Sequence, residues 1–205
     1  MSKKKPLIVF EGIEGSGKST LINYASQCLK SKKIKFIKIR EPGGNNNSEK
    51  IRSLILNKKN KFNSFTDLML YFAARSENVE KIIKKNYQKK VILLDRFSDS
   101  TIAYQHYGMG LSISLIKKIN KLILKNIEPT KVFLNTVNMR NLSKRLKLRK
   151  NKNRYDKFDL NFYKKVQDGF LKLSKNKSKY IIIDSNKKLT ENKKKVLNSI
   201  LKLIN

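Results

Sequence analysis

Residues 12–19 read GIEGSGKS, which matches G-x-x-x-x-G-K-[ST], the pattern of a phosphate-binding loop. The apolar run Leu7–Phe10 comes directly before this pattern, and a helical pattern comes directly after it. Glycines let consecutive backbone N–H groups in such a loop turn toward an anion, and the following helix adds the positive end of its dipole. This order predicts an α/β sheet that holds nucleotide phosphates at one edge.

The residue types of the loop predict a role for each position. Lys18 can reach the β- and γ-phosphates of a nucleotide, and the Ser19 hydroxyl can ligate Mg²⁺. We expect a bound nucleotide to contact Gly12, Ile13, Glu14, Gly15, Ser16, Gly17, Lys18, Ser19 and Thr20.

Short apolar runs alternate with helical patterns along the chain. The runs are Leu7–Phe10, Lys35–Ile39, Val91–Leu94, Lys131–Leu134 and Tyr180–Ile183. The helical patterns are Lys18–Ser31, Glu49–Leu56, Thr66–Asn86, Ser112–Asn126, Asn138–Arg149, Asn161–Asn176 and Thr190–Ile204. Near-continuous apolar strands favour a parallel sheet that is covered on both faces. We predict one doubly wound α/β domain over residues 1–205, with a five-stranded parallel sheet and ligands beyond the carboxyl ends of its strands.

The net charge of +33 would ordinarily suggest a nucleic-acid-binding protein. The chain has 40 Lys and 22 Asn, but only 8 Arg, 3 Pro and no Trp. Residues with AT-rich codons are enriched along the whole chain, which indicates mutational bias in an AT-rich bacterial genome rather than a binding face. We expect no nucleic-acid partner, and a basic nucleic-acid-binding module stays the alternative.

Cysteine content and the N-terminus bear on the compartment. Cys28 is the single cysteine, so we expect no disulfide framework within one chain. The apolar run behind the basic N-terminus has only about five residues, too few for a signal peptide or a membrane span. We expect a cytoplasmic protein with no membrane partner.

Charged residues follow the second and third predicted strands. REPGG spans residues 40–44, and DRFSDST spans residues 95–101. An acidic residue such as Asp95, at the end of an apolar strand, is the usual position of a carboxylate that holds Mg²⁺ beside a phosphate loop. The guanidinium of Arg96 suits a pair of phosphate oxygens. An Asp-Arg pair alone is often a structural ion pair, but beside the loop it predicts a metal site made by Ser19 and Asp95.

Four motifs together resemble the thymidylate kinases, which are P-loop nucleoside monophosphate kinases. They are EGIEGSGKST at 11–20, REPGG at 40–44, YFAAR at 71–75 and LLDRFSDSTIAYQ at 93–105. The resemblance covers nearly the whole chain. It implies transfer of the ATP γ-phosphoryl group to dTMP, giving dTDP and ADP in dTTP biosynthesis, with Mg²⁺ as cofactor and a homodimeric assembly. A kinase for another nucleoside monophosphate, the second alternative, should lack the YFAAR and DSTIAYQ contacts.

The resemblance also implies roles for single residues. Asp95 would act through Mg²⁺ or its waters, Arg96 would hold the acceptor phosphate, and Arg52 is a further candidate near that phosphate. The implied catalytic residues are Lys18, Asp95, Arg96, Arg149 and Arg154. The implied dTMP-binding residues are Glu14, Arg40, Tyr71, Arg75, Arg96, Ser100, Thr101, Tyr104 and Gln105.

The i,i+4 spacing of Tyr71 and Arg75 puts both side chains on one face of a helix. The resemblance implies that Tyr71 stacks on the thymine ring, that Arg75 donates to a base carbonyl, and that the ring of Tyr104 excludes a ribose 2′-hydroxyl. A plain core role for Tyr71 stays open.

The segment at about 145–158 contains three of the eight arginines and resembles the mobile lid of the family. The phosphate loop has Gly15 and Ser16 but no arginine of its own. We hypothesise that Arg149 or Arg154 reaches the transferring phosphate as an arginine finger does, so that alanine at either position reduces turnover more than dTMP affinity.

Three features have no such role. Asn135 stands where relatives often have Asp, and the stretch 45–47 has no counterpart in the family. His106 is expected to be a loop residue, because phosphoryl transfer to a phosphate acceptor needs no strong base.

Overall fold

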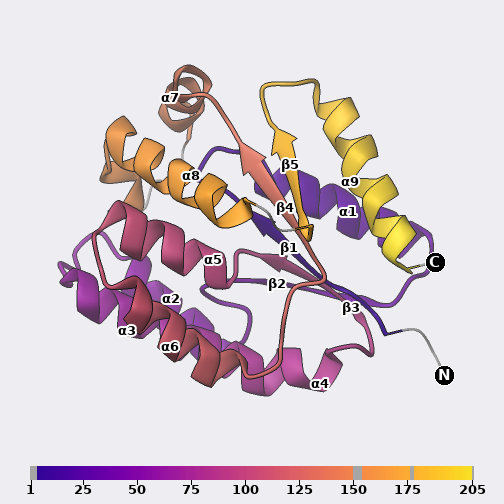
Figure 1. Cartoon of the computed structure of the whole chain (residues 1–205), viewed down its shortest axis with the longest axis horizontal. Helices are drawn as coiled ribbons and strands as arrows, with labels where there is room; N and C mark the ends of the chain where they lie inside the picture. The colour runs from indigo at the N-terminus through magenta and orange to yellow at the C-terminus, as the bar shows by residue number, and fades with distance from the viewer. Residues whose placement is uncertain (1–3, 150–153, 176–177, 205) are drawn as a thin grey trace.

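The computed structural model describes residues 4–149, 154–175 and 178–204. A sheet of five parallel strands, in the order β2-β3-β1-β4-β5, forms its centre (Figure 1). The strands are β1 (Leu7–Glu11), β2 (Phe36–Arg40), β3 (Val91–Asp95), β4 (Lys131–Thr136) and β5 (Tyr180–Asp184). The structure confirms the predicted strands and the parallel α/β fold.

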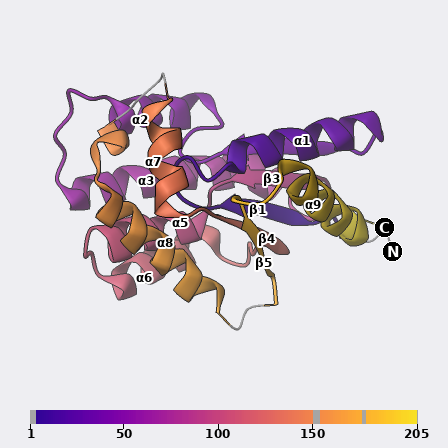
Figure 2. The same ribbon diagram turned by 90° about the horizontal axis from the view of Figure 1, so that it is seen from above.

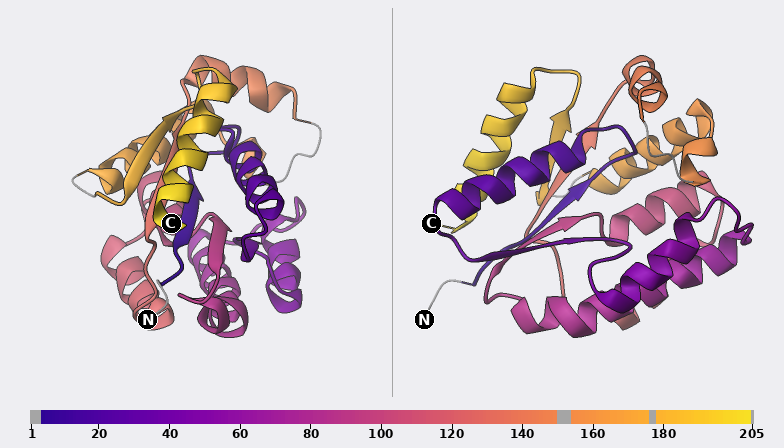
Figure 3. Two further views of the ribbon diagram at one scale, coloured as in Figure 1. Left: turned by 90° about the vertical axis from the view of Figure 1, so that its right-hand side faces the viewer. Right: turned by 180° about the vertical axis from the view of Figure 1, so that it is seen from behind.

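Helices cover both faces of this sheet, as predicted. Along the central strand β1, Ile8 and Phe10 pack against α1 (Lys18–Ser31) and α9 (Leu189–Ile204). The alternate residues of β1 face the opposite side, because successive side chains of a strand point to opposite faces. Figure 2 shows α1 on one side of the sheet and α6 and α8 on the other, and the right panel of Figure 3 shows α1 and α9 together.

The remaining elements lie mainly on the second face or at the carboxyl edge of the sheet. Their bounds are α2 (Asn46–Leu56), α3 (Ser64–Asn78), α4 (Lys84–Asn86), α5 (Ser98–Thr101), α6 (Ile113–Leu124), α7 (Met139–Lys147) and α8 (Leu160–Ser174). Two π-helical segments, Val79–Ile83 and Ile102–Gly108, and a 3₁₀ turn, Arg154–Lys157, complete them. In the part of the chain described, no helix combines the length and apolarity needed to cross a bilayer.

Two helices differ from the sequence-based expectation. The helix predicted from Glu49 begins at Asn46, because the Asn45 side chain accepts hydrogen bonds from the backbone N–H groups of Asn47 and Ser48, at 3.0 and 3.1 Å. Asn45 is therefore a helix cap, which accounts for part of the unassigned asparagine stretch. The second difference is the predicted helix over 66–86, which is α3, a π-helical segment and α4 in succession.

The helical stretch 98–108 was not predicted. It begins where the buried carboxylate of Glu11 accepts hydrogen bonds from the N–H groups of Phe97 and Ser100, at 2.8 and 3.3 Å. Ser100 also donates its hydroxyl to Glu11, at 2.5 Å. These bonds satisfy backbone donors at the start of the helix from outside the helix itself, so the local sequence carried no signal for it.

Candidate active site

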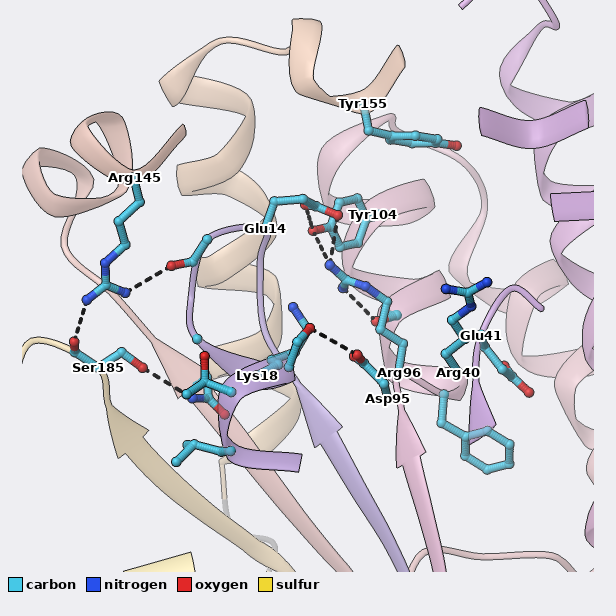
Figure 4. Close-up of a pocket in the computed structure, with 18 of the residues that line it drawn as sticks. Glu14, Lys18, Arg40, Glu41, Asp95, Arg96, Tyr104, Arg145, Tyr155 and Ser185 are labelled. Atoms are coloured by element: carbon cyan, nitrogen blue, oxygen red, sulfur yellow. Dashed lines mark hydrogen bonds and ion pairs between the residues drawn. The ribbon is translucent and has the colours of Figure 1, made fainter. Parts of the chain in front are cut away.

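The carboxyl ends of the strands open into a cavity of about 720 Å³ (Figure 4). The phosphate loop (residues 12–19), the turn after β2, helix α3 and the start of α5 form its walls. Most predicted site residues line it: Glu14, Gly15, Gly17, Lys18, Ser19, Thr20, Arg40, Arg52, Tyr71, Arg75, Asp95, Arg96, Ser100, Thr101, Tyr104, Gln105 and Arg149. Gly12, Ile13, Ser16 and Arg154 are not among its lining residues.

The phosphate loop depends on glycine backbone geometry at two of its positions. Gly12 has φ of 134° and lies so close to the backbone carbonyl of Asn135 that a Cβ would collide with it. Gly17 has φ of 86° and directly precedes α1. Both values lie in the region that glycine adopts readily and other residues adopt at a cost. The loop conformation expected from the sequence is therefore formed.

Lys18 is buried inside the phosphate loop. Its Nζ donates to the carbonyl of Ile13 at 2.9 Å. Burial and the nearby charge of Arg96 lower the pKa of Lys18 to about 8, partly offset by Asp95 and Glu14. The ammonium is therefore retained at neutral pH, and it lies where loop amides and a cation can act together on phosphate oxygens.

Ser19 and Asp95, the two residues expected to hold Mg²⁺, lie together at the mouth of the loop. The Ser19 hydroxyl donates to Oδ2 of Asp95 at 3.3 Å. Within residues 4–149, 154–175 and 178–204, no cluster of three or more His, Cys, Asp or Glu side chains could hold a metal ion. Mg²⁺ is commonly bound by one or two protein oxygens, with water and substrate phosphates completing its shell. A hydroxyl and a carboxylate beside a phosphate loop fit that kind of site.

Arg96 joins the end of β3 to the phosphate loop. Its φ of 71° is unusual for a residue with a side chain. Backbone strain of this kind costs about 1–3 kcal/mol and is concentrated at functional sites. Nη1 donates to the Gly12 carbonyl at 2.8 Å and to the Ser100 hydroxyl at 3.1 Å. Nη2 donates to Oε1 of Glu14 at 2.8 Å, and the guanidinium lies over the Tyr104 ring, 5.0 Å from its centroid.

Glu14 is the anionic partner in this arrangement. Burial would raise its pKa, but the charges of Arg96 and Lys18 outweigh burial and keep the pKa of Glu14 below its usual value. The Tyr104 hydroxyl donates to Oε2 of the same carboxylate. Glu14 is thus an ionised hydrogen-bond acceptor that faces the cavity from within the loop.

Arg75 is held rigidly on the wall made by α3. Its Nε donates to Glu41 at 2.8 Å, its Nη1 to Asn120 at 2.8 Å, and its Nη2 to the Phe97 carbonyl at 3.0 Å. Each terminal nitrogen carries two hydrogens, so these bonds leave one N–H on each. The guanidinium can therefore be fixed by the protein and still donate to a ligand.

Glu41 was missed as a functional residue by the sequence reasoning. Burial raises its pKa, and the guanidinium of Arg75 opposes that rise. Glu41 lies within the REPGG motif, which was the available signal, but its partner is 34 positions away in the sequence and only the fold joins them.

The outer side of the phosphate loop is anchored by three residues that were not predicted to be in the site. Arg145 of α7 donates to the Gly15 carbonyl at 2.9 Å and to the Ser185 carbonyl at 2.7 Å (Figure 4). Asn135 and Ser185 both donate to the Ser16 carbonyl, at 3.2 and 2.6 Å. Asn135 and Ser185 lie at or just after the ends of β4 and β5, which is the edge where the fold places ligands.

The two arginines expected in the lid lie in different places. Arg149 lines the cavity. Arg154 forms an ion pair with Asp67 of α3 and lies over the ring of Phe62, 5.8 Å from its centroid. Residues 150–153 of the expected lid lie outside the described residues.

His106 lies outside the cavity lining, in the π-helical segment 102–108. Its Nδ1 is 2.7 Å from the Leu111 carbonyl, and its ring packs on Tyr107. This placement supports a structural rather than a chemical role for the histidine.

Comparisons with known proteins agree on one family. The family model described as thymidylate kinase matches residues 10–196. A thymidylate kinase of Thermosipho africanus is 41% identical over 89% of the chain and 90% of its own length, and one of Mycoplasma capricolum is 37% identical over 96% and 93%. A crystal structure of thymidylate kinase from Ehrlichia chaffeensis superposes with a TM-score of 0.75 at 32% identity, covering 98% of each chain.

Proposed function

The chain belongs to the thymidylate kinase family, and from that premise we propose how its residues transfer the γ-phosphoryl group of ATP to dTMP. The chain is a dTMP kinase that produces dTDP and ADP. The relatives, matched over most of the chain, do not favour a kinase for another nucleotide or a nucleic-acid-binding module. The observation that carries the residue assignments is the Arg96–Glu14 ion pair, which joins the phosphate loop to the acceptor side of one cavity.

Lys18 and the amides of the phosphate loop bind the β- and γ-phosphates of ATP. The Lys18 ammonium leaves the Ile13 carbonyl for a phosphate oxygen, an exchange that a charged acceptor favours. Phosphoryl transfer requires that the two nucleotides be held in line and that the charge on the transferred group be neutralised. Lys18 helps to neutralise that charge from the side of the cavity that binds ATP.

Ser19 and Asp95 would hold Mg²⁺ through the hydroxyl and the carboxylate, directly or through water. When bound, the ion neutralises charge on the β- and γ-phosphates.

Arg96, Arg40 and Arg52 bind the acceptor phosphate. Burial, and then the charge of Arg40, lower the pKa of Arg52, so the two guanidinium groups repel one another. A phosphate between them would relieve that repulsion. Arg40 is positioned by Glu49 at 2.9 Å, and Arg52 by the Pro42 carbonyl at 2.7 Å.

Tyr71, Arg75 and Thr101 bind the thymine base, and Gln105 lies near the sugar. Tyr71 supplies the ring face, and Arg75 supplies an N–H from a guanidinium that the protein already orients. Among the described residues, no acceptor pairs with the buried Nε2 of Gln105, which lines the cavity. A buried donor of this kind favours a ligand acceptor beside it.

Arg149, which lines the cavity, is the arginine that contacts the transferring phosphate. Ser100 and Tyr104, which lie beside Arg96, complete the side of the cavity that binds the acceptor. We keep the expectation that the ring of Tyr104 excludes a ribose 2′-hydroxyl.

Assembly and location complete the proposal. The whole chain acts as one catalytic domain, paired as a homodimer in the cytoplasm, where ATP and dTMP are available. The exposed apolar side chains Leu54, Phe65 and Leu122, on α2, α3 and α6, supply apolar surface for such a contact. Light scattering on the purified protein measures the mass directly, and a monomer at all concentrations would contradict the dimer.

A coupled ADP-release assay with ATP and Mg²⁺ tests the activity on dTMP, dUMP, UMP, CMP and AMP. We expect turnover with dTMP well above that with the other acceptors. Lys18→Ala should abolish it, whereas Lys30→Ala, which changes an exposed lysine of the same helix, should not. A folded protein that phosphorylates none of the five would contradict the proposal.

A further inference from the structure

Glu11, the last residue of β1, carries a carboxylate that is only 1% exposed. Burying a carboxylate is costly unless hydrogen bonds or opposite charges compensate it. Glu11 is not among the residues that line the cavity, so its protein partners, rather than a ligand, decide what it does.

Both carboxylate oxygens of Glu11 are bound by the segment that follows β3. Oε1 accepts the backbone N–H groups of Phe97 and Ser100, at 2.8 and 3.3 Å. Oε2 accepts the Ser100 hydroxyl at 2.5 Å. Glu11 therefore holds the residue directly after Arg96 and also a side chain that Arg96 contacts.

These bonds constrain Arg96 through both its main chain and its side chain. Arg96 donates its own N–H to the Phe10 carbonyl at 3.0 Å, and the next N–H along the chain, that of Phe97, is the one that Glu11 holds. Nη1 of Arg96 donates to the Ser100 hydroxyl at 3.1 Å. A residue with φ of 71° keeps that conformation only where its surroundings over-determine it. The end of β1 supplies much of this constraint.

The Ser100 hydroxyl connects Glu11 to Arg96 with a defined direction. A serine hydroxyl has one hydrogen and two lone pairs. An ionised carboxylate only accepts, so the hydrogen points to Oε2 of Glu11 and a lone pair is left for Nη1 of Arg96. Burial and the charge of Asp99 raise the pKa of Glu11 to about 7, and above that pH the carboxylate is ionised.

Phe97 connects Glu11 to a second guanidinium of the cavity. The Phe97 carbonyl accepts from Nη2 of Arg75 at 3.0 Å, while its N–H is bound by Glu11. A displacement of Phe97 would therefore move an acceptor of Arg75 and the main chain beside Arg96 at the same time.

We propose that Glu11 is a positioning residue for the transfer reaction. Its carboxylate orients the Ser100 hydroxyl, and through that hydroxyl it holds the Arg96 guanidinium in place without contacting either nucleotide. The inference rests on the proposed function for the role of Arg96 at the acceptor phosphate. The connection from Glu11 to Arg96 rests on the hydrogen bonds alone.

Glu11→Gln isolates the connection to Ser100. The amide oxygen can keep both backbone N–H bonds, and the NH₂ group then faces the Ser100 hydroxyl, which must accept where it donated before. The hydroxyl hydrogen then competes with the N–H of Arg96. In steady-state kinetics at a pH above the Glu11 pKa of about 7, we expect kcat/KM for dTMP to fall by about 10-fold, with the KM for ATP within about 2-fold of the wild type.

A double-variant cycle distinguishes this connection from a general loss of structure. Ser100→Ala removes the hydroxyl, and adding Glu11→Gln should then cause no further loss of kcat/KM for dTMP, because both changes break one connection. Asp99→Asn is the matched control, since it makes the same change of carboxylate to amide at the start of α5, where Asp99 accepts from the Tyr180 hydroxyl. It should leave kcat/KM for dTMP within about 2-fold of the wild type.

Two results would overturn the inference. One is a kcat/KM for dTMP in Glu11→Gln that stays within about 2-fold of the wild type. The other is an additive cycle, in which Glu11→Gln lowers kcat/KM by the same factor with and without the Ser100 hydroxyl. Either result, found with an active wild type, contradicts the inference alone. A wild-type protein without turnover of dTMP contradicts the proposed function, and this inference with it.

Discussion

Arg96 and Glu14 form an ion pair of 2.8 Å that connects the end of β3 to the middle of the phosphate loop. Arg96 also donates to the Gly12 carbonyl, so the same guanidinium contacts the loop at two points. In the proposed function, the donor and acceptor nucleotides meet between these two elements. A fixed distance between them is therefore a condition for in-line transfer.

This relationship predicts that the guanidinium cannot be replaced by an ammonium. Arg96→Lys keeps the charge but loses the planar fork that serves Gly12, Ser100 and Glu14 together. We expect kcat/KM for dTMP to fall by about 100-fold, the loss expected for charge-assisted hydrogen bonds. Steady-state kinetics at saturating ATP measure it. Activity within about 3-fold of the wild type would show that charge alone is sufficient.

Lys18 predicts an alkaline limit on ATP use. Because burial and the charge of Arg96 lower its pKa to about 8, the free enzyme loses the loop cation as the pH rises through that value. kcat/KM for ATP, which reports groups of the free enzyme, should therefore decline above about pH 8. Lys18→Arg does not titrate in this range, so its residual activity should lack the decline. If kcat/KM for ATP declines at the same pH in Lys18→Arg, the decline belongs to another group.

Glu11 predicts a pH dependence of stability. Burial and the charge of Asp99 raise its pKa in the folded protein to about 7, above its unfolded value of about 4.5. Between those values the folded state binds more protons than the unfolded state, so the contribution of Glu11 is fully present below about pH 4.5 and is lost by about pH 7, up to about 3 kcal/mol. Glu11→Gln should remove this slope in urea unfolding measured across the same pH range. A parallel slope in both proteins would contradict the assignment.

The substitution Arg145→Ala should weaken the ATP-binding site. The change removes the hydrogen bonds to the carbonyls of Gly15 and Ser185, which leaves the outer side of the phosphate loop less firmly held. The KM for ATP should rise by about 10-fold, with the KM for dTMP nearly unchanged. Arg140→Ala, on the exposed side of the same helix, should leave both constants as they are.

Asn45→Ala should lower the free energy of unfolding by about 1 kcal/mol, because α2 loses its N-cap. Asn47→Ala is the matched control. Its exposed side chain donates to Glu77 at the surface, so the change should cost less than about 0.5 kcal/mol. Equal losses in the two variants would show that the cap contributes nothing special.

The three central strands β1, β3 and β4 could be predicted because their burial makes them almost continuously apolar. All five residues of β1 are buried, so the run is continuously apolar up to Glu11. The helix that begins at Ser98 could not be predicted in the same way, since its first N–H groups are satisfied by Glu11, 86 and 89 positions away. Local periodicity does not record a partner at that separation.

The candidate site divides along the same line. Lys18, Ser19, Asp95 and Arg96 lie next to recognisable motifs and line the cavity together. Tyr155 also lines the cavity, but it lies beside a run of lysines and asparagines that obscured any pattern. The sequence therefore predicted residues that line the cavity, but not the side chains that orient them.

Because residues far away in the sequence anchor the phosphate loop, the effects of substitutions in this enzyme are easily misinterpreted. Ser185 is 169 positions from Ser16, yet its hydroxyl bonds to the carbonyl of that residue. A substitution at the far end of the chain can therefore produce the kinetic profile of a defect in nucleotide binding. In a survey of inactive variants, such positions would be mistaken for residues that contact the nucleotide, although they act by holding the phosphate loop in place.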